Sequence, residues 1–209
     1  WTYELRERGH NGAYFGIEKD ALGTYILNAR DMNLIEHLPA VIETGACSLK
    51  IEGRMKSIAY VATVVNAYRM ALDRYAAAPD EPLPAELSKE LDYASHRPYT
   101  TGFSFGDPGA AGQAPQIADY VSEAQISAVV LSYDAQAQTA YVEQRNRFAD
   151  GDVLSILSPG DISRTFTVRS IRNEAGETQQ TAPHPKQRLH IGCIEPVQAG
   201  DILRKIRGH

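Results

Sequence analysis

Polar and apolar residues alternate along residues 47–53, which read CSLKIEG. If this stretch is a strand, Leu49 and Ile51 lie on one face and Lys50 and Glu52 on the other, because successive side chains of a strand point to opposite sides. The alternation therefore predicts a strand with one apolar face and one charged face, followed directly by a glycine turn.

A strand and a helix are also predicted just upstream. Residues 24–28, TYILN, have the β-branched and aromatic content of a short strand. Asp31 is a candidate N-cap for a following helix whose apolar residues recur at helical spacing, and Gly45 is a candidate for its end. Pro39 falls inside this pattern and predicts a kink, or a boundary between two short helices.

A second, longer helix is predicted to begin after Ser57, which is its candidate N-cap. Its apolar stripe comprises Ile58, Val61, Ala62, Val65, Tyr68, Leu72 and Tyr75. The order of strand, helix, strand and helix, with short connections, predicts a parallel sheet with right-handed crossovers. Two strands cannot cover two helices, so the remaining strands are expected from upstream sequence or from another chain.

The rest of the chain divides into a linker region and a β-rich domain. Residues 79–125 are rich in proline, glycine and serine, and predict a linker and an ordered loop with one short helix at 87–95. From residue 126 to 209 the period of the pattern changes to two, and turn sequences separate six short strand-like runs: ISAVVLSYD, TAYVEQ, DVLSIL, RTFTVRSI, RLHIGCI and DILRKI. This spacing predicts a small antiparallel β-barrel.

Two of the six predicted strands follow the same kind of turn. The sequences are ADGDVLSI at 149–156 and QAGDILRK at 198–205. In each, a glycine permits a tight turn, and the aspartate after it can accept a hydrogen bond from the backbone of its own turn. The two strands are therefore expected to begin alike.

Composition narrows the class of protein. The 209 residues are 43% hydrophobic, which is ordinary for a globular protein, and no apolar run reaches the ~20 residues of a membrane helix. The N-terminus lacks the pattern of a signal peptide, so a cytoplasmic location is expected. Since the chain begins at Trp1 and not at methionine, we expect it to be a fragment of a longer protein.

The charge is distributed unevenly. The net charge is −5, but residues 126–209 hold ten Lys and Arg against nine Asp and Glu, so the acidic excess lies in the first part. The basic residues of the second part could form a nucleic-acid-binding face; a solvated, charge-mixed surface is the alternative. Cys47 and Cys193 lack the spacing of a disulfide framework or a metal site, and both are expected to be small buried residues.

One group of candidate site residues surrounds the quoted stretch. In a barrel of parallel strands the active site lies at the carboxyl end, where Lys50 and Glu52 would point into the lumen. Gly53 would turn the chain and deliver Arg54 as a clamp for a carboxylate or phosphate, with Asn28 on the same rim. The alternative is an internal ion pair between Lys50 and Glu52 that only satisfies a polar lumen.

Two further groups lie in predicted loops. His96, Arg97 and Tyr99 could bind an anion or a nucleotide, or could instead cap the neighbouring helix and hold the loop. Arg145 and Arg147 could contact RNA or phosphate, with a plain polar hairpin tip as the alternative. The sequence contains no GxSxG elbow, HExxH pair or glycine-rich phosphate loop.

Four stretches of the sequence carry a family resemblance. They are SLKIEGRMKSIAYVATVVNAYRMALD, YILNARDMNLIEHLPAVIETG, SHRPYTTGF and VEQRNRFADGD. Together they resemble the collagenase-like peptidase family U32, and within it the branch associated with 5-hydroxyuridine in tRNA. The resemblance implies that residues 1–78 are the last βα units of an incomplete TIM-like catalytic domain. It also implies that residues 126–209 form a barrel similar to the second domain of translation GTPases.

The same resemblance implies an activity, cofactors and partners. Relatives hold an iron–sulfur cluster through cysteines, the last of which lies in a Cys-Arg-Trp stretch that would place it just before Trp1. That branch is associated with prephenate-dependent hydroxylation of the wobble uridine in tRNA. No cofactor is expected in this fragment, whose two cysteines lie in other contexts, and the fragment alone is expected to be inactive. The expected partners are tRNA, the missing N-terminal part of the chain and a second copy bound through the incomplete sheet.

We therefore expect the parent protein to be a tRNA-hydroxylating enzyme. Lys50 and Arg54 would bind anionic groups, Glu52 would orient them or act as an acid or base, and the barrel would dock RNA. One alternative is a peptidase of the collagenase-like kind that acts on proteins. A second alternative is a non-catalytic module that binds RNA or protein.

Overall fold

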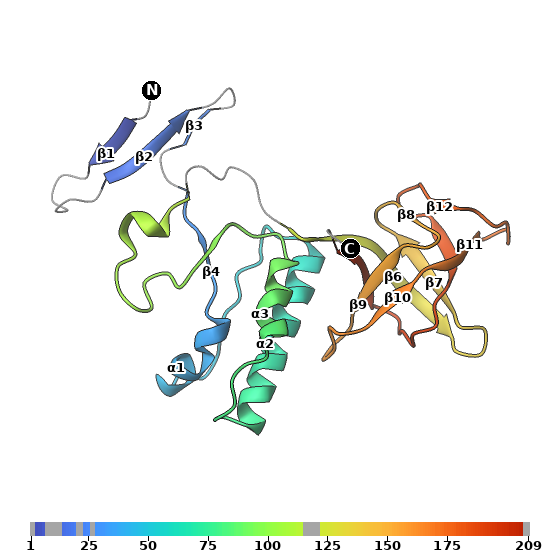
Figure 1. Ribbon diagram of the computed structural model, residues 1–209, viewed down its shortest axis with the longest axis horizontal. Helices are drawn as coiled ribbons and strands as arrows, with labels where there is room; N and C mark the ends of the chain where they lie inside the picture. The colour runs from blue at the N-terminus through green and yellow to red at the C-terminus, as the bar shows by residue number, and fades with distance from the viewer. Residues whose placement is uncertain (1–2, 7–13, 20–22, 26–27, 115–121, 207–209) are drawn as a thin grey trace. The chain divides into compact units, whose positions relative to one another are not determined.

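The computed structural model describes residues 3–6, 14–19, 23–25, 28–114 and 122–206. Contacts divide the chain into two compact units, and Figure 1 labels helices and strands of both. The first unit is made of residues 1–38 and 95–121, and the second of residues 39–94 and 122–209. Each unit thus joins segments that are distant in the sequence. The boundaries expected near residues 78 and 125 remain predictions.

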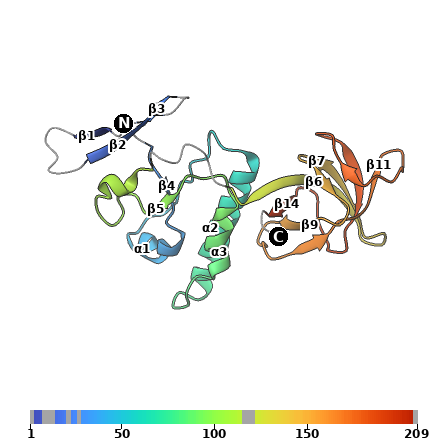
Figure 2. The same cartoon turned by 45° about the horizontal axis from the view of Figure 1, so that its top comes forward.

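The first unit is built from short strands and two 3₁₀ turns. The antiparallel strands β1 (Tyr3–Arg6), β2 (Tyr14–Lys19) and β3 (Thr24–Tyr25) form one sheet in that order. A second pairing is parallel and joins β4 (Asp31–Met32) to β5 (Tyr99–Thr100) (Figure 2). The 3₁₀ turns are Ile35–His37 and Gly109–Gly112. β3 coincides with the start of the strand expected at 24–28, of which residues 26–27 lie outside the described ranges.

Asp31 does not cap a helix, contrary to the prediction. It lies in β4, and its carboxylate accepts the backbone N–H of Arg97. The polar side chain that opens the following turn is Asn33, whose Oδ1 accepts the N–H of Ile35 at 3.0 Å. The local sequence suggested that a helix starts at Asp31, but the residue instead belongs to a parallel strand pairing with residues far along the chain.

The predicted boundary at Pro39 is confirmed. The 3₁₀ turn passes directly into the short helix α1 (Leu38–Glu43), and the proline lies in its first turn, where a missing N–H removes no helical hydrogen bond. Gly45, at φ +81°, ends the helix as expected, and its N–H donates to the carbonyl of Ile42. Only a glycine adopts this conformation without strain.

The strand expected at residues 47–53 is not formed. The backbone of these residues is neither strand nor helix. An extended segment needs a neighbour to satisfy its backbone groups, and no described strand pairs with this one. Among the described strands, the one parallel pairing is that of β4 with β5. The TIM-like barrel thus remains a prediction from the sequence.

The helix α2 (Ile58–Ala77) confirms the predicted long helix and its cap, since the Ser57 hydroxyl accepts the backbone N–H of Tyr60 at 3.2 Å. Its buried face is not the predicted stripe: Ile58 is 85% exposed. The buried residues of α2 are Thr63, Val64, Ala67 and Ala71. Small side chains let α2 approach α3 (Ala85–Asp92), so the available partner decides which face is buried.

No helix in the described ranges is long and apolar enough to cross a membrane.

The second unit contains a curled antiparallel sheet (Figure 2). Its order is β10 (Thr165–Thr167), β9 (Val153–Leu157), β14 (Ile202–Ile206), β6 (Ala124–Asp134), β7 (Thr139–Gln144), β13 (Arg188–Gly192) and β11 (Arg169–Asn173). Only Val168 separates the two edge strands along the chain, so the sheet has to curl to bring them together. A ribbon of β8 (Phe148–Ala149) and β12 (Thr181–Ala182) accompanies it. This half-barrel is consistent with the predicted β-barrel.

The inner face of the half-barrel forms one apolar core. Fully buried members from five strands are Val130, Val142, Leu154, Ile156, Leu189, Ile191 and Leu203. In β7 and β13 they alternate with more exposed residues, as the period of two predicted. Most of β9 and the first three residues of β14 are instead buried on both faces, so the hydrophobic pattern decides the buried face only where one side of the sheet is exposed.

The run RTFTVRSI, expected as one strand, forms two strands that break at the buried Val168. The second strand carries a bulge between Arg169 and Arg172, where Ser170 has φ +44°. Gly192 faces this bulge, and an added Cβ would lie 2.9 Å from the Arg169 carbonyl oxygen. The break and the bulge together turn the chain from one sheet edge to the other.

The two glycine–aspartate turns have the same hydrogen bond, as predicted. Asp152 Oδ2 accepts the backbone N–H of Ala149, and Asp201 Oδ2 accepts that of Gln198, both at 2.9 Å. The glycine before each aspartate has a positive φ, 87° and 95° respectively. The following strands, β9 and β14, pair with each other in the sheet.

A buried ion pair joins the helices to the half-barrel within the second unit. Arg204 donates from Nη1 to Glu90 Oε1 at 2.5 Å and from Nη2 to Oε2 at 3.2 Å, and both side chains are only 2% exposed. Nη2 also donates to the Ser155 hydroxyl at 3.2 Å, and Tyr93 places its ring centroid 5.4 Å from the guanidinium. One arginine thus connects β14, β9 and α3.

Candidate functional site

The predicted residues around Gly53 lie close together at the surface. Lys50 Nζ is 3.5 Å from Glu52 Oε2, and the backbone N–H of Arg54 donates to Glu52 Oε1 at 3.1 Å. The side chains of Lys50 and Glu52 are 86% and 69% exposed. The Gly53 turn lies against α2, where an added Cβ would be 3.2 Å from Val61 Cγ2. The structure brings this group together, and its catalytic role remains a prediction.

Glu52 is held as a carboxylate. The hydrogen bond from the Arg54 backbone, together with the neighbouring Lys50 ammonium, lowers the pKa of Glu52 below its ordinary value. A carboxylate with a lowered pKa is a weak base near neutral pH, but it can hold a cation in place. The geometry therefore suits a Glu52 that orients Lys50 better than a Glu52 that transfers protons.

Arg97 is the centre of the second predicted group. Its backbone N–H donates to Asp31 Oδ2 at 3.1 Å, its Nε donates to Asp31 Oδ1 at 3.2 Å, and its Nη1 donates to Asn28 Oδ1 at 2.9 Å. Asn28 Nδ2 donates in turn to the Ala114 carbonyl at 3.0 Å. These contacts hold three segments of the first unit together. They favour the loop-holding alternative for Arg97, whose role in substrate binding remains a prediction.

His96 and Tyr99 stack beside this network. Their ring centroids are 4.0 Å apart and their planes differ by 7°. His96 Nδ1 lies 2.7 Å from the Arg97 carbonyl oxygen, a distance that requires this nitrogen to carry the proton. The imidazole is buried, so its orientation is fixed by the stack and by the hydrogen bond.

The two predicted RNA-binding arginines differ in their surroundings. Arg145 Nη2 lies 2.8 Å from Glu143 Oε1, so part of its charge is already neutralised. The backbone N–H groups of Arg145 and Asn146 both donate to the carbonyl of Ser127, which fixes the turn between β7 and β8. This turn is not the hairpin tip that the sequence suggested, because β7 pairs with β6 and β13 while β8 pairs with β12. Arg147 is exposed and forms no ion pair with the described residues. These residues therefore form an ordered turn in which the Arg147 guanidinium has no ion-pair partner among the described residues.

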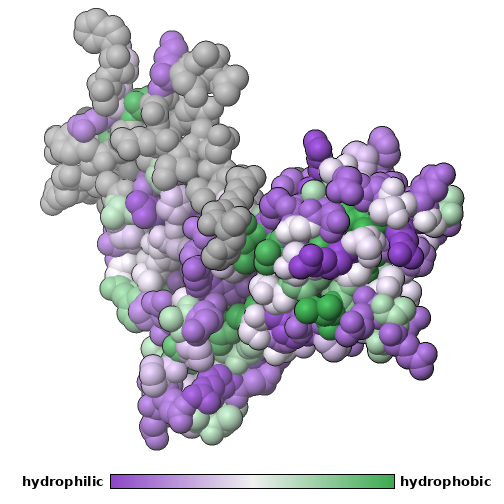
Figure 3. Space-filling model, turned by 45° about the vertical axis from the view of Figure 1, so that its right-hand side comes forward, coloured by the Kyte–Doolittle hydropathy of each residue, from purple (hydrophilic) through white to green (hydrophobic). Residues whose placement is uncertain are grey.

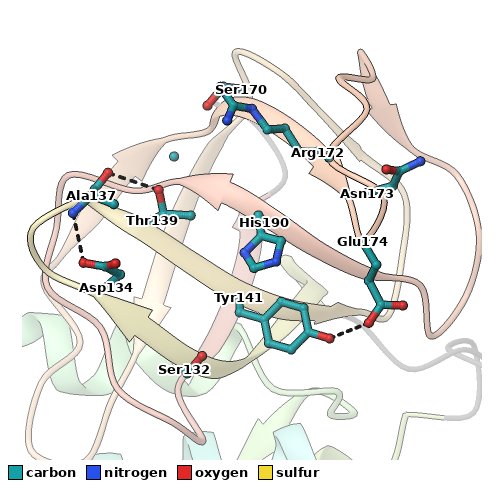
Figure 4. Close-up of a pocket in the computed structure, with 12 residues that line it drawn as sticks. Ser132, Asp134, Ala137, Thr139, Tyr141, Ser170, Arg172, Asn173, Glu174 and His190 are labelled. Atoms are coloured by element: carbon teal, nitrogen blue, oxygen red, sulfur yellow. Dashed lines mark hydrogen bonds between the residues drawn. The ribbon is translucent and has the colours of Figure 1, made fainter.

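A hollow of about 640 Å³ lies on the outer face of the half-barrel, over β6, β7, β13 and β11 (Figure 4). Strand register places Arg172, His190, Tyr141 and Ser132 in one row across it, because each is paired with the next on the neighbouring strand. The residues that alternate with them, such as Val142, are buried in the core. None of the four was among the predicted site residues.

Tyr141 and His190 form the aromatic part of this hollow. Their ring centroids are 4.7 Å apart and the planes differ by 27°. The Tyr141 hydroxyl donates to Glu174 Oε1 at 2.7 Å, and this hydrogen bond raises the pKa of Tyr141. In the sequence, the alternating runs TAYVEQ and RLHIG place these rings on the polar side of their strands. Only the register of the sheet makes them neighbours.

The cysteines do not fit an iron–sulfur cluster, which is typically held by four thiolates. The chain has two. Burial raises the pKa of the Cys193 thiol to about 11, which keeps it protonated. Cys47, expected to be buried, is exposed because the strand predicted to contain it is not formed. Within the described ranges, no three His, Cys, Asp or Glu side chains are grouped to hold a metal ion.

Both parts of the chain match models of known families. The model described as Peptidase family U32 matches residues 1–114, and the model described as Peptidase family U32 C-terminal domain matches residues 122–204. A crystal structure of a U32 peptidase C-terminal domain from Geobacillus thermoleovorans is 30% identical in sequence. That comparison covers 39% of this chain and 99% of the other, with a TM-score of 0.37.

Two bacterial proteins are similar to this chain over most of its length. The tRNA hydroxylation protein P1 of Bacillus subtilis (strain 168) is 35% identical over 209 residues, which cover 98% of this chain and 49% of the relative. The tRNA hydroxylation protein P of Escherichia coli (strain K12) is 33% identical over 183 residues, which cover 87% and 40%. The chain therefore spans about half the length of these relatives or less.

The half-barrel and the two adjacent matches define a class of proteins that join a U32 peptidase domain to its C-terminal domain. The chain belongs to peptidase family U32. This confirms the family resemblance that was based on four stretches of the sequence, around residues 28, 50, 96 and 145.

Proposed function

We propose that this chain contributes to the hydroxylation of tRNA at the wobble uridine, in a reaction that uses prephenate. The observation that carries the proposal is the 35% identity, along 98% of the chain, with a protein named for tRNA hydroxylation. Because the chain spans 49% of that relative, the proposed activity is that of a longer protein, and this chain by itself is expected to be inactive.

Lys50 and Arg54 are the proposed anion-binding residues of that reaction. Two cations beside a glycine turn suit the carboxylate groups of prephenate. Glu52 has a lowered pKa and is proposed to hold Lys50 in position. Asn28 is proposed to act from the neighbouring rim of the substrate site. His96, Arg97 and Tyr99 are proposed to bind substrate through the loop that they hold in place.

The half-barrel is the proposed RNA-docking part, and Arg145 and Arg147 are its proposed contacts from the sequence. A tRNA substrate would be consistent with a cytoplasmic location. The iron–sulfur cluster implied by the resemblance is not assigned to this chain, whose cysteines do not fit it. The remaining part of a longer protein, or a second copy of this chain, is proposed to complete the first predicted domain.

The experiment is mass spectrometry of tRNA nucleosides from cells that lack the full-length gene. The cells are complemented with the wild type, with Lys50→Ala plus Glu52→Ala, or with Lys89→Ala plus Glu86→Ala. The last variant removes the same two charges from exposed positions of α3 and serves as the matched control. We expect hydroxylated wobble uridine to disappear on deletion, and to return with the wild type and the control only.

Two other outcomes separate the parts of this proposal. If deletion leaves the hydroxylated nucleoside unchanged, the tRNA function is wrong. If the Lys50 and Glu52 variant restores the nucleoside as fully as the control does, the function stands and the proposed role of these two residues fails.

A peptidase is the second candidate, and the family name favours it. Digestion of casein or gelatin by the full-length protein, without any change in tRNA nucleosides, would support that candidate. A third possibility is a non-catalytic module. This possibility would be supported if the full-length protein shifts the gel mobility of tRNA in a salt-dependent way but neither modifies nucleosides nor digests proteins.

A further inference from the structure

The hollow on the half-barrel has aromatic side chains on a surface where a strand normally presents isolated polar groups. Tyr141 and His190 are outward residues of adjacent strands and stack on each other at 4.7 Å. A cross-strand aromatic pair stabilises a sheet by about 0.2–1 kcal/mol, so sheet stability is one explanation of the pair. It does not explain why the pair lies within a hollow of about 640 Å³ (Figure 4).

The ring of Tyr141 is held in place before any ligand arrives. Glu174, from the turn after β11, accepts a hydrogen bond from the Tyr141 hydroxyl at 2.7 Å, and His190 covers part of the ring. A ring whose position is already fixed loses little conformational freedom on binding, which favours affinity. A rigid aromatic surface of this kind suits the flat face of a nucleobase.

The cations near the hollow have no ion-pair partner among the described residues. Elsewhere in the half-barrel Arg145, Arg164, Arg204 and Lys205 each form an ion pair. Arg172, Lys186 and Arg188 form no ion pair with any described residue, although Arg188 interacts with the Tyr141 hydroxyl. Unpaired cations of this kind are available for phosphate groups.

The acidic groups of the hollow are already occupied by the protein. Asp134 accepts the backbone N–H groups of Gln136 and Ala137, and Glu174 accepts the hydroxyl of Tyr141. In Figure 3 the surface over the barrel strands is mainly hydrophilic, with small hydrophobic patches. These hydrogen bonds orient the two carboxylates, and Arg172, Lys186 and Arg188 supply positive charge along the two hollows.

The shape of this surface extends beyond one base. A second hollow of about 510 Å³ shares Asn173 and Glu174 with the first, and is lined also by Lys186, Gln187 and Arg188. A volume of several hundred Å³ is large enough for a small organic group such as a base. The second hollow, which adjoins the first, is lined by the cations Lys186 and Arg188. The two hollows together can accept a base and the backbone that continues from it.

We infer that this surface binds an unpaired nucleotide of RNA, with the base against Tyr141 and His190 and the adjoining phosphates at Arg172 and Arg188. The inference deepens the proposed function and rests on its RNA-docking half-barrel. It assigns the RNA contact to the β7, β13 and β11 face, in addition to Arg145 and Arg147, which were proposed from the sequence. An unpaired nucleotide is specified because a base within a duplex does not expose its face for stacking.

The test is fluorescence anisotropy of the 209-residue chain with a fluorescein-labelled anticodon stem-loop RNA, and with a fully paired RNA of the same length. We expect Tyr141→Ala to weaken binding of the stem-loop about 5- to 150-fold, the range for losing one base–aromatic stack. Tyr141→Phe retains the ring and should change binding less than about threefold. The duplex should bind more weakly than the stem-loop, and Tyr141→Ala should change its binding little.

Arg172→Ala tests the phosphate contact independently. It is an exposed residue, so its removal leaves the core intact, and we expect weaker binding with the salt-dependence slope reduced by about one. Arg164→Ala is the matched control, since it removes the same charge from a residue that is already paired with Asp161 and lies outside the hollow. Thermal unfolding of each variant confirms that the chain is folded.

The outcomes distinguish this inference from the proposed function. If the wild type binds the stem-loop and both Tyr141→Ala and Arg172→Ala bind it equally well, the inference is wrong while RNA docking stands. If the wild type binds no RNA even at low salt, RNA docking by this chain fails and the inference fails with it. Binding of labelled unfolded casein that Tyr141→Ala abolishes, without RNA binding, would assign the surface to polypeptide.

Discussion

Arg204 is a charged residue whose side chain is almost completely buried. Its guanidinium is buried, and Glu90 neutralises it through two hydrogen bonds of 2.5 and 3.2 Å. Burial raises the pKa of Glu90, while its bonds to Arg204 oppose that shift. A buried pair contributes little net stability, yet the loss of one partner leaves a buried charge uncompensated. The pair therefore specifies how α3 attaches to the half-barrel.

Glu90→Ala should lower the free energy of unfolding by about 3–5 kcal/mol, because it leaves Arg204 buried without its carboxylate. Urea denaturation measures the change. Asp73→Ala breaks the exposed ion pair between Arg69 and Asp73 and is the matched control, expected to cost less than about 1 kcal/mol. Equal losses for the two variants would show that the buried pair is no more important than a surface one.

At the scale of elements, the bulge at the start of β11 decides how the sheet curls. Ser170 has φ +44°, and the backbone of β11 passes so close to Gly192 that a Cβ would meet both the carbonyl oxygen and the Cβ of Arg169, at 2.9 and 3.0 Å. Backbone atoms cannot yield as a flexible side chain can. The glycine is therefore required by the close approach of two strands.

Gly192→Ala should destabilise the half-barrel by about 1–3 kcal/mol, the usual cost of inserting a methyl group where there is no room. Chemical denaturation measures it, and amide exchange should locate the loss of protection in β11 and β13. Thr139→Ala, on the paired position of β7, is the control and should have a small effect. An unchanged stability for Gly192→Ala would mean that the bulge can relax at no cost.

At the scale of the whole molecule, α2 presents an apolar face for which the described structure offers no cover. Ile58, Val61 and Val65 are 85%, 41% and 46% exposed, and all three belong to the stripe that the sequence predicted to be buried. The opposite face of α2 carries the contacts with α3. The second copy proposed above as one way to complete the first predicted domain would cover this face.

Val61→Lys with Val65→Lys should abolish self-association of the 209-residue chain, because charged side chains replace the apolar contact. The helix should remain folded, since lysine has a higher helix propensity than valine. Sedimentation velocity over a range of concentrations measures the effect. Ala76→Lys with Ala77→Lys adds the same charge at the end of α2 and is the control. A wild-type chain that stays monomeric at every concentration would contradict the proposal.

The features that the sequence by itself determined are those controlled by neighbours in the chain. Ser57 caps α2 through the N–H of Tyr60, three residues on, and the aspartates of the two GD turns accept N–H groups three residues back. The inward and outward faces of β7 and β13 follow from a period of two. Each of these depends on a few consecutive residues, so the pattern alone predicts it.

Only the tertiary structure decided the features that need a distant partner. Residues 47–53 have the pattern of a strand, but no described strand pairs with them. Asp31 has the position of a helix cap, but Arg97 holds it in a strand pairing. The row of Arg172, His190 and Tyr141 exists only because three strands meet in one register. Pairing partners and register depend on segments far apart in the sequence, which local patterns do not encode.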